Sequence, residues 1–277
     1  MLAPDGSRPW TFYFFAAFFG LFVAFLYGPM IVIYILSFQG PNGGMTFPMN
    51  GVSLHWFIAL VEQTRVGDIA GSFQRSIMLA AMVAVVTVLL AVLAGLAFRR
   101  PFRGSVFAFY LAIASLIMPG LFVGLGIALT FRLIGLPTSW ATSGLGAQLT
   151  WTLPFGLLIM FAVLGRFNRS YEEAAIDLGA TNWQKLKEVT LPMLLPGIIG
   201  VALFGFTLSY DEIARTALAA GSKNTLPLEI WAMTTNVTSP TLYAVGAVTT
   251  IVSFIVIVVA LTSIGAIQRR RSRRSST

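Results

Sequence analysis

The sequence predicts an all-α membrane protein, and three observations support this fold class. Of the 277 residues, 57% are hydrophobic and only 10% are charged, whereas soluble domains carry about 25% charged residues. Backbone groups cannot stay unpaired in lipid, and the alternating pattern of a membrane barrel is absent, so the spans must be helices. Crossing the roughly 30 Å hydrocarbon layer takes about 20 helical residues. Six uncharged segments are long enough: 12–39, 76–98, 105–131, 144–165, 191–210 and 242–267.

The first span is an expected N-terminal anchor, because its apolar core is longer than the h-region of a cleaved signal peptide. We assign residues 1–71 to this anchor and an outer loop, 72–262 to the main membrane domain, and 263–277 to a basic tail. In the third span, Pro119-Gly120 with Gly124 and Gly126 indicates an interruption. It could be a kink or unwound stretch that lines a cavity, or a surface for close helix packing.

The positions of the basic residues predict the orientation. With both termini in the cytoplasm, most of the 18 Lys and Arg residues fall inside, including Arg99, Arg100 and the run at 269–274. This agrees with the positive-inside rule. We interpret the basic tail as a contact with anionic lipid, and we expect no nucleic-acid partner.

The composition also excludes several kinds of enzyme site. There is no cysteine and a single histidine, His55, which lies in the expected outer loop. Thiolate metal sites, disulfides, cysteine nucleophiles and histidine-dependent triads are therefore not expected. We predict no catalytic residue and no metal site on this chain.

The loop between the fourth and fifth spans, 166–191, has the strongest local pattern. Ser170 and Glu173 have the spacing of a capping box at a helix start, and Gly179 suits a left-handed residue at the helix end. Thr181 and Gln184 repeat the capping-box spacing. We expect two short helices joined by a tight glycine turn. The first would expose small side chains that let another protein's backbone come close; they are Ala174 and Ala175, next to Leu178.

This loop resembles the signature loop of the membrane subunits of binding-protein-dependent ABC importers. The matching run is Glu173-Ala174-Ala175, then Gly179, then Leu191-Pro192, with Val189 where the family usually has Ile. The likeness covers about residues 72–261 and implies a type I ABC importer permease fold. It also implies that the loop forms a coupling helix seated in a groove of a separate ATPase. The residues expected to dock on the ATPase either match the motif or adjoin it; they are Glu172, Glu173, Ala174, Ala175, Leu178 and Gly179.

The resemblance further implies the partners of the chain. They are a second permease subunit, expected to be non-identical, two ATPase subunits that carry ATP and Mg²⁺, and an extracytoplasmic solute-binding protein. No Gly-Lys dipeptide occurs in the sequence, so a phosphate-binding loop is missing here. We expect a transport subunit without a cofactor of its own, in the inner membrane of a bacterium.

Candidates for the solute pathway follow the fifth span. Asp211 and Glu212 lie about 21 Å along the helix from Gly197, and ionisable groups at such depth are functional candidates. Ser209-Tyr210-Asp211-Glu212 resembles the polyamine branch, which often has Ser-x-Asp-Asp here. The pathway candidates are Tyr210, Asp211, Glu212 and Trp231, whose carboxylates and rings suit an ammonium group.

Two other interpretations of this segment stay open. Glu212 and Arg215 are three residues apart and could pair on one helix face, while Asp211 could cap or brace a break in the span. An arginine in the pathway would suit a zwitterionic or anionic solute instead. For the whole chain, the leading hypothesis is a permease subunit of an ATP-driven importer for a polyamine or other amine-bearing solute. The alternative is a secondary transporter driven by an ion gradient, although five of the six spans lack the ionisable groups that it would need.

Overall fold

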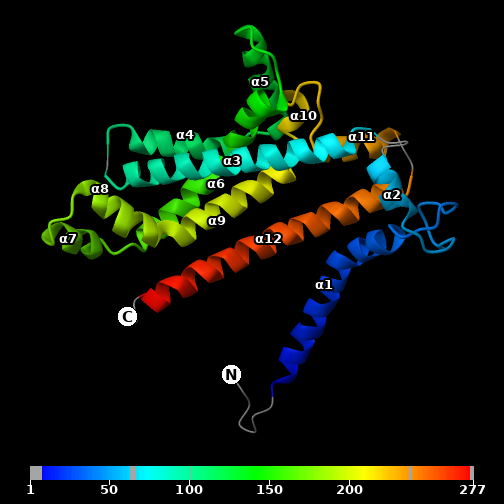
Figure 1. Ribbon diagram of the computed structural model, residues 1–277, viewed down its shortest axis with the longest axis horizontal. Coiled ribbons are helices and arrows are strands. Elements are labelled where there is room, and N and C mark those ends of the chain that lie inside the picture. Colours follow the sequence, from blue (N-terminus) through cyan, green and yellow to red (C-terminus); the bar gives the residue numbers. More distant parts are fainter. Residues whose placement is uncertain (1–7, 63–66, 101, 237–238, 275–277) are drawn as a thin grey trace. The chain divides into compact units, whose positions relative to one another are not determined.

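The computed structural model describes residues 8–62, 67–100, 102–236 and 239–274, and this part of the chain is helical (Figure 1). It contains no strand, only the isolated bridge between Gln39 and Val52. The all-α prediction is confirmed. The helices are α1 (Trp10–Leu36), α2 (His55–Glu62), α3 (Ile69–Phe98), α4 (Ser105–Ile117), α5 (Gly120–Leu133), α6 (Leu145–Gly165), α7 (Ser170–Asp177), α8 (Asn182–Gln184), α9 (Leu191–Tyr210), α10 (Thr216–Ala219), α11 (Leu226–Asn236) and α12 (Thr241–Arg274), with π-helical turns η1 (Trp140–Gly144) and η2 (Lys185–Thr190).

The chain divides into two compact units, residues 1–67 with 232–252 and residues 68–231 with 253–277. In the first unit, the hydroxyl of Tyr243 donates a hydrogen bond of 2.8 Å to the carbonyl of Met45. This bond holds the loop after α1 against the start of α12. The second unit contains α3 to α10, the part of α11 up to Trp231, and all the candidate residues described below.

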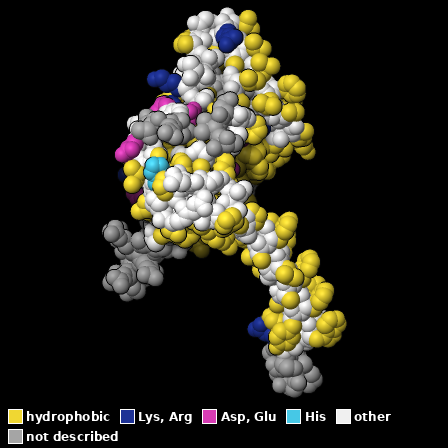
Figure 2. Space-filling model, turned by 90° about the vertical axis from the view of Figure 1, so that its right-hand side faces the viewer, with side chains coloured by type: hydrophobic (Ala, Val, Ile, Leu, Met, Phe, Trp, Pro, Cys, Tyr) yellow, Lys and Arg dark blue, Asp and Glu magenta, His cyan; other side chains and the backbone are white. Residues whose placement is uncertain are grey.

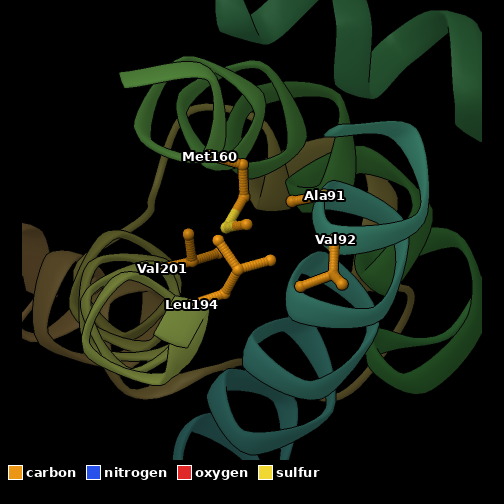
Figure 3. Close-up of a cluster of buried hydrophobic side chains, with 5 residues drawn as sticks. All are labelled: Ala91, Val92, Met160, Leu194 and Val201. Atoms are coloured by element: carbon orange, nitrogen blue, oxygen red, sulfur yellow. The ribbon is translucent and has the colours of Figure 1, made fainter. Parts of the chain in front are cut away.

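The core of the second unit lies between α3, α6 and α9. Ala91 and Val92 of α3, Met160 of α6, and Leu194 and Val201 of α9 meet in one buried cluster (Figure 3). Lipid tails are as apolar as leucine, so such helices associate through close packing at small residues. Gly156 shows this, because an added Cβ would lie 2.9 Å from Thr87 Cγ2. The three helices therefore form one close-packed bundle.

Four of the predicted spans correspond to single long helices or helix runs: Trp10–Leu36, Ile69–Phe98, Trp140–Gly165 and Asn182–Tyr210. The third predicted span, 105–131, is not one straight helix, and the interruption predicted at Pro119-Gly120 is confirmed. It is a pair of helices, α4 and α5, bent by 111°. The break falls at Met118, which is extended at φ −71° and ψ 133°, because a residue before proline disfavours the helical region.

The sixth predicted span lies within α12, which is helical from Thr241 to Arg274. In the part of α12 whose side chains are described, the apolar stretch is Thr241–Ile255. Among the described residues, four helices are long and apolar enough to cross a membrane, or five with the bent pair, and the count of six is not reproduced. Residues 1–7 of the predicted anchor domain and 275–277 of the basic tail lie outside the described residues.

Large hydrophobic side chains are exposed on several helices, and they cover much of the face seen in Figure 2. Phe25 of α1 is 78% exposed and Ile117 of α4 is 82% exposed. A soluble surface rarely carries contiguous apolar area on this scale. Such a surface suits contact with lipid or with helices of other subunits.

Candidate functional site

The start of α7 differs from the predicted capping box. The N-cap is Arg169, and no side chain caps the helix. Asn168 Oδ1 instead accepts a hydrogen bond of 3.0 Å from the Ser170 backbone N–H. This is a turn made by an Asn side chain two residues before the bonded N–H, so the chain is already turning when it reaches Ser170. The predicted pairing of Ser170 with Glu173 is therefore wrong, although the predicted helix is present.

The end of α7 confirms the predicted glycine turn. Gly179 has φ +85°, the left-handed region in which a side chain is strained. Its N–H donates to Ile176 O at 2.8 Å, and the N–H of Ala180 donates to Ala175 O at 3.0 Å. These two bonds form a Schellman motif, which satisfies the last carbonyls of the helix. The chain reverses sharply here because the residue is glycine.

The second predicted capping box is also confirmed. Gln184 N–H donates to Thr181 Oγ1 at 3.3 Å, and Thr181 N–H donates to Gln184 Oε1 at 2.9 Å. The expected second short helix, however, does not end before the fifth span. It continues through η2 into α9, so that 182–210 is one helical run of 29 residues. A displacement applied at Thr181 therefore acts on one end of this continuous helical run.

The structure adds a partly buried ion pair that links α7 to two other segments. Arg99, the C-cap of α3, donates to both carboxylate oxygens of Glu172, at 2.8 and 2.7 Å. Thr190 Oγ1 donates to Glu172 Oε1 at 2.6 Å. The Arg99 guanidinium also lies 5.1 Å from the ring centre of Phe167, within cation–π range. We call Arg99, Glu172 and Thr190 the clamp.

Both ends of this ion pair are largely shielded from solvent. The side chains of Arg99 and Glu172 are 17% and 13% exposed. The hydrogen bonds from Arg99 hold the pKa of the Glu172 carboxyl below its usual value, with a further lowering by Thr190 and an opposing effect of burial. The hydrogen bond to Glu172 raises the pKa of Arg99. Both groups are therefore charged at neutral pH.

The clamp changes the composition of the expected docking surface. Glu172 was expected to face an ATPase, but its carboxylate points to Arg99 and Thr190. Glu173, Ala174 and Gly179 are exposed, Ala175 is half-buried, and Leu178 is 89% exposed. The exposed surface of α7 therefore combines the small Ala174 and Gly179 and the apolar Leu178 with the carboxylate of Glu173, and Glu172 is not part of it. Arg99 and Thr190 were missed because Arg99 is 73 residues from its partner, and nothing in the local pattern marks so distant a pairing.

A cavity of about 540 Å³ lies beside the clamp. Its lining includes the clamp residues with apolar and basic neighbours from α3, α7 and η2, namely Leu96, Arg169, Ile176, Lys185 and Leu186. Beside this cavity, α7 is joined to the end of α3 by the Arg99–Glu172 bonds of the clamp and by a bond of 3.3 Å from Arg169 Nη2 to the Arg99 carbonyl.

The four pathway candidates after the fifth span fall into different environments. Tyr210 is the last residue of α9 and stacks on Phe206 with ring centres 6.1 Å apart. Asp211 is exposed and is the C-cap of α9. Glu212 is only 8% exposed, while Trp231 on α11 is 61% exposed. The structure therefore separates the two acidic neighbours, one buried and one exposed.

Glu212 makes the pair with Arg215 that the sequence left open. Its Oε1 accepts from the Arg215 backbone N–H at 2.7 Å, and its Oε2 lies 3.8 Å from Arg215 Nη1. The Arg215 guanidinium is 4.8 Å from the ring centre of Trp151. Glu212 therefore compensates a buried arginine, and the bracing role that the sequence offered for Asp211 belongs to Glu212.

Polar bonds and close packing extend around this turn. Ser209 Oγ donates to Gln148 Oε1, and Gln148 Nε2 donates to Thr216 Oγ1 at 3.0 Å. On the other side, a Cβ on Gly124 of α5 would lie 2.3 Å from the Arg215 carbonyl oxygen. Of the two interpretations of the span-three glycines, close packing is confirmed at Gly124, whereas Gly126 has open space around it.

Comparison with protein families decides the class of the chain. The model of the family described as "Binding-protein-dependent transport system inner membrane component" matches residues 87–274. This range is more than half of the chain, and it includes the clamp, α7 and the α9–α10 turn. The chain belongs to this family. It is a multi-pass subunit of an inner-membrane transport system, and it is not an enzyme.

Two curated relatives of this permease are from Escherichia coli (strain K12). The putrescine transport system permease protein PotI is 31% identical over 215 residues, which cover 75% of each chain. The spermidine/putrescine transport system permease protein PotC is 27% identical over 237 residues, 85% of this chain and 88% of the relative. The predicted resemblance to the polyamine branch of ABC importer permeases is confirmed.

A solved structure confirms the fold of the permease. A chain of a bacterial ABC transporter involved in the import of alginate superposes with a TM-score of 0.68 at 14% identity, covering 94% of this chain and 96% of that chain. At this identity the match concerns the fold alone. The predicted ABC importer permease architecture is present.

Proposed function

We propose that this permease is one membrane subunit of an ATP-driven importer that moves a polyamine or another small amine-bearing solute by alternating access. A solute-binding protein outside the membrane would deliver the solute. A second, non-identical permease subunit would complete the pathway, and two ATPase subunits would supply ATP hydrolysis with Mg²⁺. Both termini would lie in the cytoplasm. The observation that carries the proposal is α7, a helix closed by the Schellman motif at Gly179, which exposes small side chains and is bonded to α3 through Glu172.

The shape of α7 supports a docking role. Ala174 and Gly179 present almost no side-chain volume, so a groove in another protein can approach the helix backbone closely. Leu178 adds an apolar side chain that is 89% exposed. The Schellman motif and the Thr181 capping box fix the backbone on both sides of the turn between α7 and α8. Because this connection is ordered, a movement of α7 is transmitted to α9.

The electrostatics near the end of α9 support an amine-bearing solute. Arg215 would repel a cation if its charge were uncompensated, but Glu212 pairs with it. The exposed Asp211 carboxylate makes no hydrogen bond or ion pair within the described part of the chain. Asp211 is therefore the acidic group that can attract an ammonium, with the Tyr210 ring beside it.

A zwitterionic or anionic solute is the second candidate, favoured by one observation. Arg215 Nε is buried and has no hydrogen-bond partner among the described residues, so it could donate to a solute carboxylate in another transport state. The two candidates make opposite predictions. An anionic solute requires Arg215, whereas a polyamine requires Asp211.

The test is uptake by the complete complex in proteoliposomes. We expect ATP-dependent uptake of radiolabelled spermidine or putrescine, and we expect Asp211→Asn to raise KM by about tenfold, corresponding to loss of one charge-assisted contact. Glu62→Gln, at the exposed end of α2 and away from the coupling loop, is the matched control for removing one carboxylate. Uptake of neither polyamine, or an unchanged KM in Asp211→Asn, would contradict the assignment of the solute.

The same system tests the energy source. We expect no uptake by the permease alone in liposomes with a proton or sodium gradient. Uptake under that gradient without ATPase subunits would show that the chain is a secondary transporter instead.

A further inference from the structure

The clamp joins three segments that are far apart in the sequence. Arg99 ends α3, Glu172 lies in the first turn of α7, and Thr190 is the last residue before α9. Each bond is short, between 2.6 and 2.8 Å. A fourth bond of 3.3 Å runs from Arg169 Nη2 to the Arg99 carbonyl. The first turn of α7 therefore cannot move from α3 and α9 without breaking charged hydrogen bonds.

Two of the helices that the clamp joins, α3 and α9, are closely packed against α6. A Cβ on Gly95 of α3 would lie 2.9 Å from Leu164 Cδ1, and a Cβ on Gly197 of α9 would lie 2.6 Å from Val163 Cγ2. Both close contacts are with α6. Close-packed elements move as units because their packing does not deform continuously. A displacement delivered to α3 and α9 at the clamp is thus delivered to α3, α6 and α9 together.

We propose that Arg99, Glu172 and Thr190 are positioning residues that convert movement of α7 into movement of the α3–α6–α9 bundle. The inference rests on the proposed function. It assigns the two ends of the coupling path to different residues: the exposed surface of α7 takes up the movement of the ATPase, and the inward face of α7 passes it to the bundle through Glu172.

The bidentate geometry has a specific consequence for the positioning role. A guanidinium bonded through two nitrogens fixes both the distance and the orientation of the carboxylate, whereas a lysine ammonium is a single point charge. Arg99→Lys should therefore keep the charge and lose the orientation. The Thr190 hydroxyl donates to the carboxylate, so Thr190→Ser keeps the third bond and Thr190→Val removes it at nearly the same volume.

The experiment measures solute transported per ATP hydrolysed by the complete complex in proteoliposomes, with spermidine as the probe. We expect Arg99→Ala and Glu172→Ala each to lower this ratio on the order of tenfold, as for mutations along a coupling path, while ATP hydrolysis stays within about twofold. Arg99→Lys and Thr190→Val should lower the ratio less. Thr190→Ser should match the unaltered protein.

The charge exchange Arg99→Glu with Glu172→Arg separates positioning from simple stabilisation. It should restore at least part of the ratio that each single substitution loses, and the neighbouring Arg100→Ala should leave the ratio unchanged. Thermal unfolding of the complex in detergent gives a second measure. If uptake and ATP hydrolysis fall together as the folded fraction falls, or if all clamp variants keep a normal ratio, the inference is wrong. If the unaltered complex shows no ATP-dependent uptake, the proposed function itself has failed.

Discussion

The loop around α7 and the turn between α9 and α10 both combine charged residues with helix ends, but they are built in opposite ways. In the loop, the backbone conformation is set by neighbouring residues: Asn168, Gly179 and Thr181 each bond within a few positions. In the turn, Glu212 and Arg215 are buried at 8% and 5% exposure, and their surroundings come from α5 and α6. Bonds between residues close in the sequence determine the backbone conformation of the loop, whereas contacts with distant helices determine the burial of the turn.

This difference predicts whether a substitution in each region affects transport or stability. A surface that is held from within its own backbone can be exposed to a partner and still keep its shape. A buried ion pair depends on the compensation of each charge, and removing one partner leaves the other uncompensated. We therefore expect substitutions in the loop to affect transport more than stability, and substitutions in the turn to do the reverse.

The largest effect on stability is expected from Glu212→Gln. It leaves the buried Arg215 charge without its carboxylate, which costs about 3–5 kcal/mol when one partner of a buried pair is removed. Thermal unfolding in detergent and the yield of folded protein measure this loss. The double substitution Glu212→Gln with Arg215→Met should recover most of it. Unchanged stability of Glu212→Gln would mean that the pair does not brace the turn.

Next in size is Gly179→Pro, which tests the loop. Proline has no N–H for the bond to Ile176 O and fixes φ near −65°, far from the observed +85°, at a cost of about 3 kcal/mol for the local motif. Uptake should fall to background while insertion into the membrane is retained. Gly165→Ala is the control, because that position has open space around it. Normal ATP-dependent uptake in Gly179→Pro would refute the role of the loop.

The sequence predicted most of the loop and little of the turn, for the same physical reason. Gly179 and the Thr181–Gln184 box act over a few residues, so their spacing in the sequence was sufficient. The Ser170 box failed because Asn168, two residues earlier, competes for the same N–H group. The Arg99–Glu172 pair could not be predicted, since it forms only when the end of α3 returns beside α7.

In the turn, spacing alone offered both a salt bridge and a solute site for Glu212. The structure shows the salt bridge, in a buried position that depends on Gln148, Trp151 and the close approach of Gly124 in α5. The fold class followed from composition, but the third span did not. Pro119 predicted an interruption, yet the sequence could not tell a mild kink from the observed bend of 111°.

A smaller effect is expected from Gly124→Ala in α5. The added Cβ would lie 2.3 Å from the backbone oxygen of Arg215, so α5 must move away from the turn, at a cost of about 1–3 kcal/mol typical of overpacking. Gly126→Ala is the control, because it is the same substitution in the same helix at a position with open space around it. Thermal unfolding should separate the two variants. Equal stability would contradict the close packing of α5 on the turn.

The smallest expected effect is a pH dependence of the clamp. The folded-state pKa of Glu172 lies below its ordinary value of 4.5, so its contribution to stability is complete above that value and is lost as pH falls through the lower one. The stability difference between the unaltered protein and Glu172→Gln should be constant from about pH 5 to 8 and should shrink below about pH 4. Unfolding measured across this range checks it. A difference that grows on acidification would contradict the clamp.

Site-specific crosslinking tests most directly whether α7 is where the ATPase binds. The chain has no cysteine, so a single Leu178→Cys, at a position 89% exposed, provides its one thiol for attaching a crosslinker in the purified complex. Leu133→Cys on α5, at a position 86% exposed, is the control, since α5 is expected on the outer side. The account predicts a crosslink from position 178 to the nucleotide-hydrolysing subunit and none from position 133. No crosslink from 178, or equal crosslinking from both positions, would contradict it.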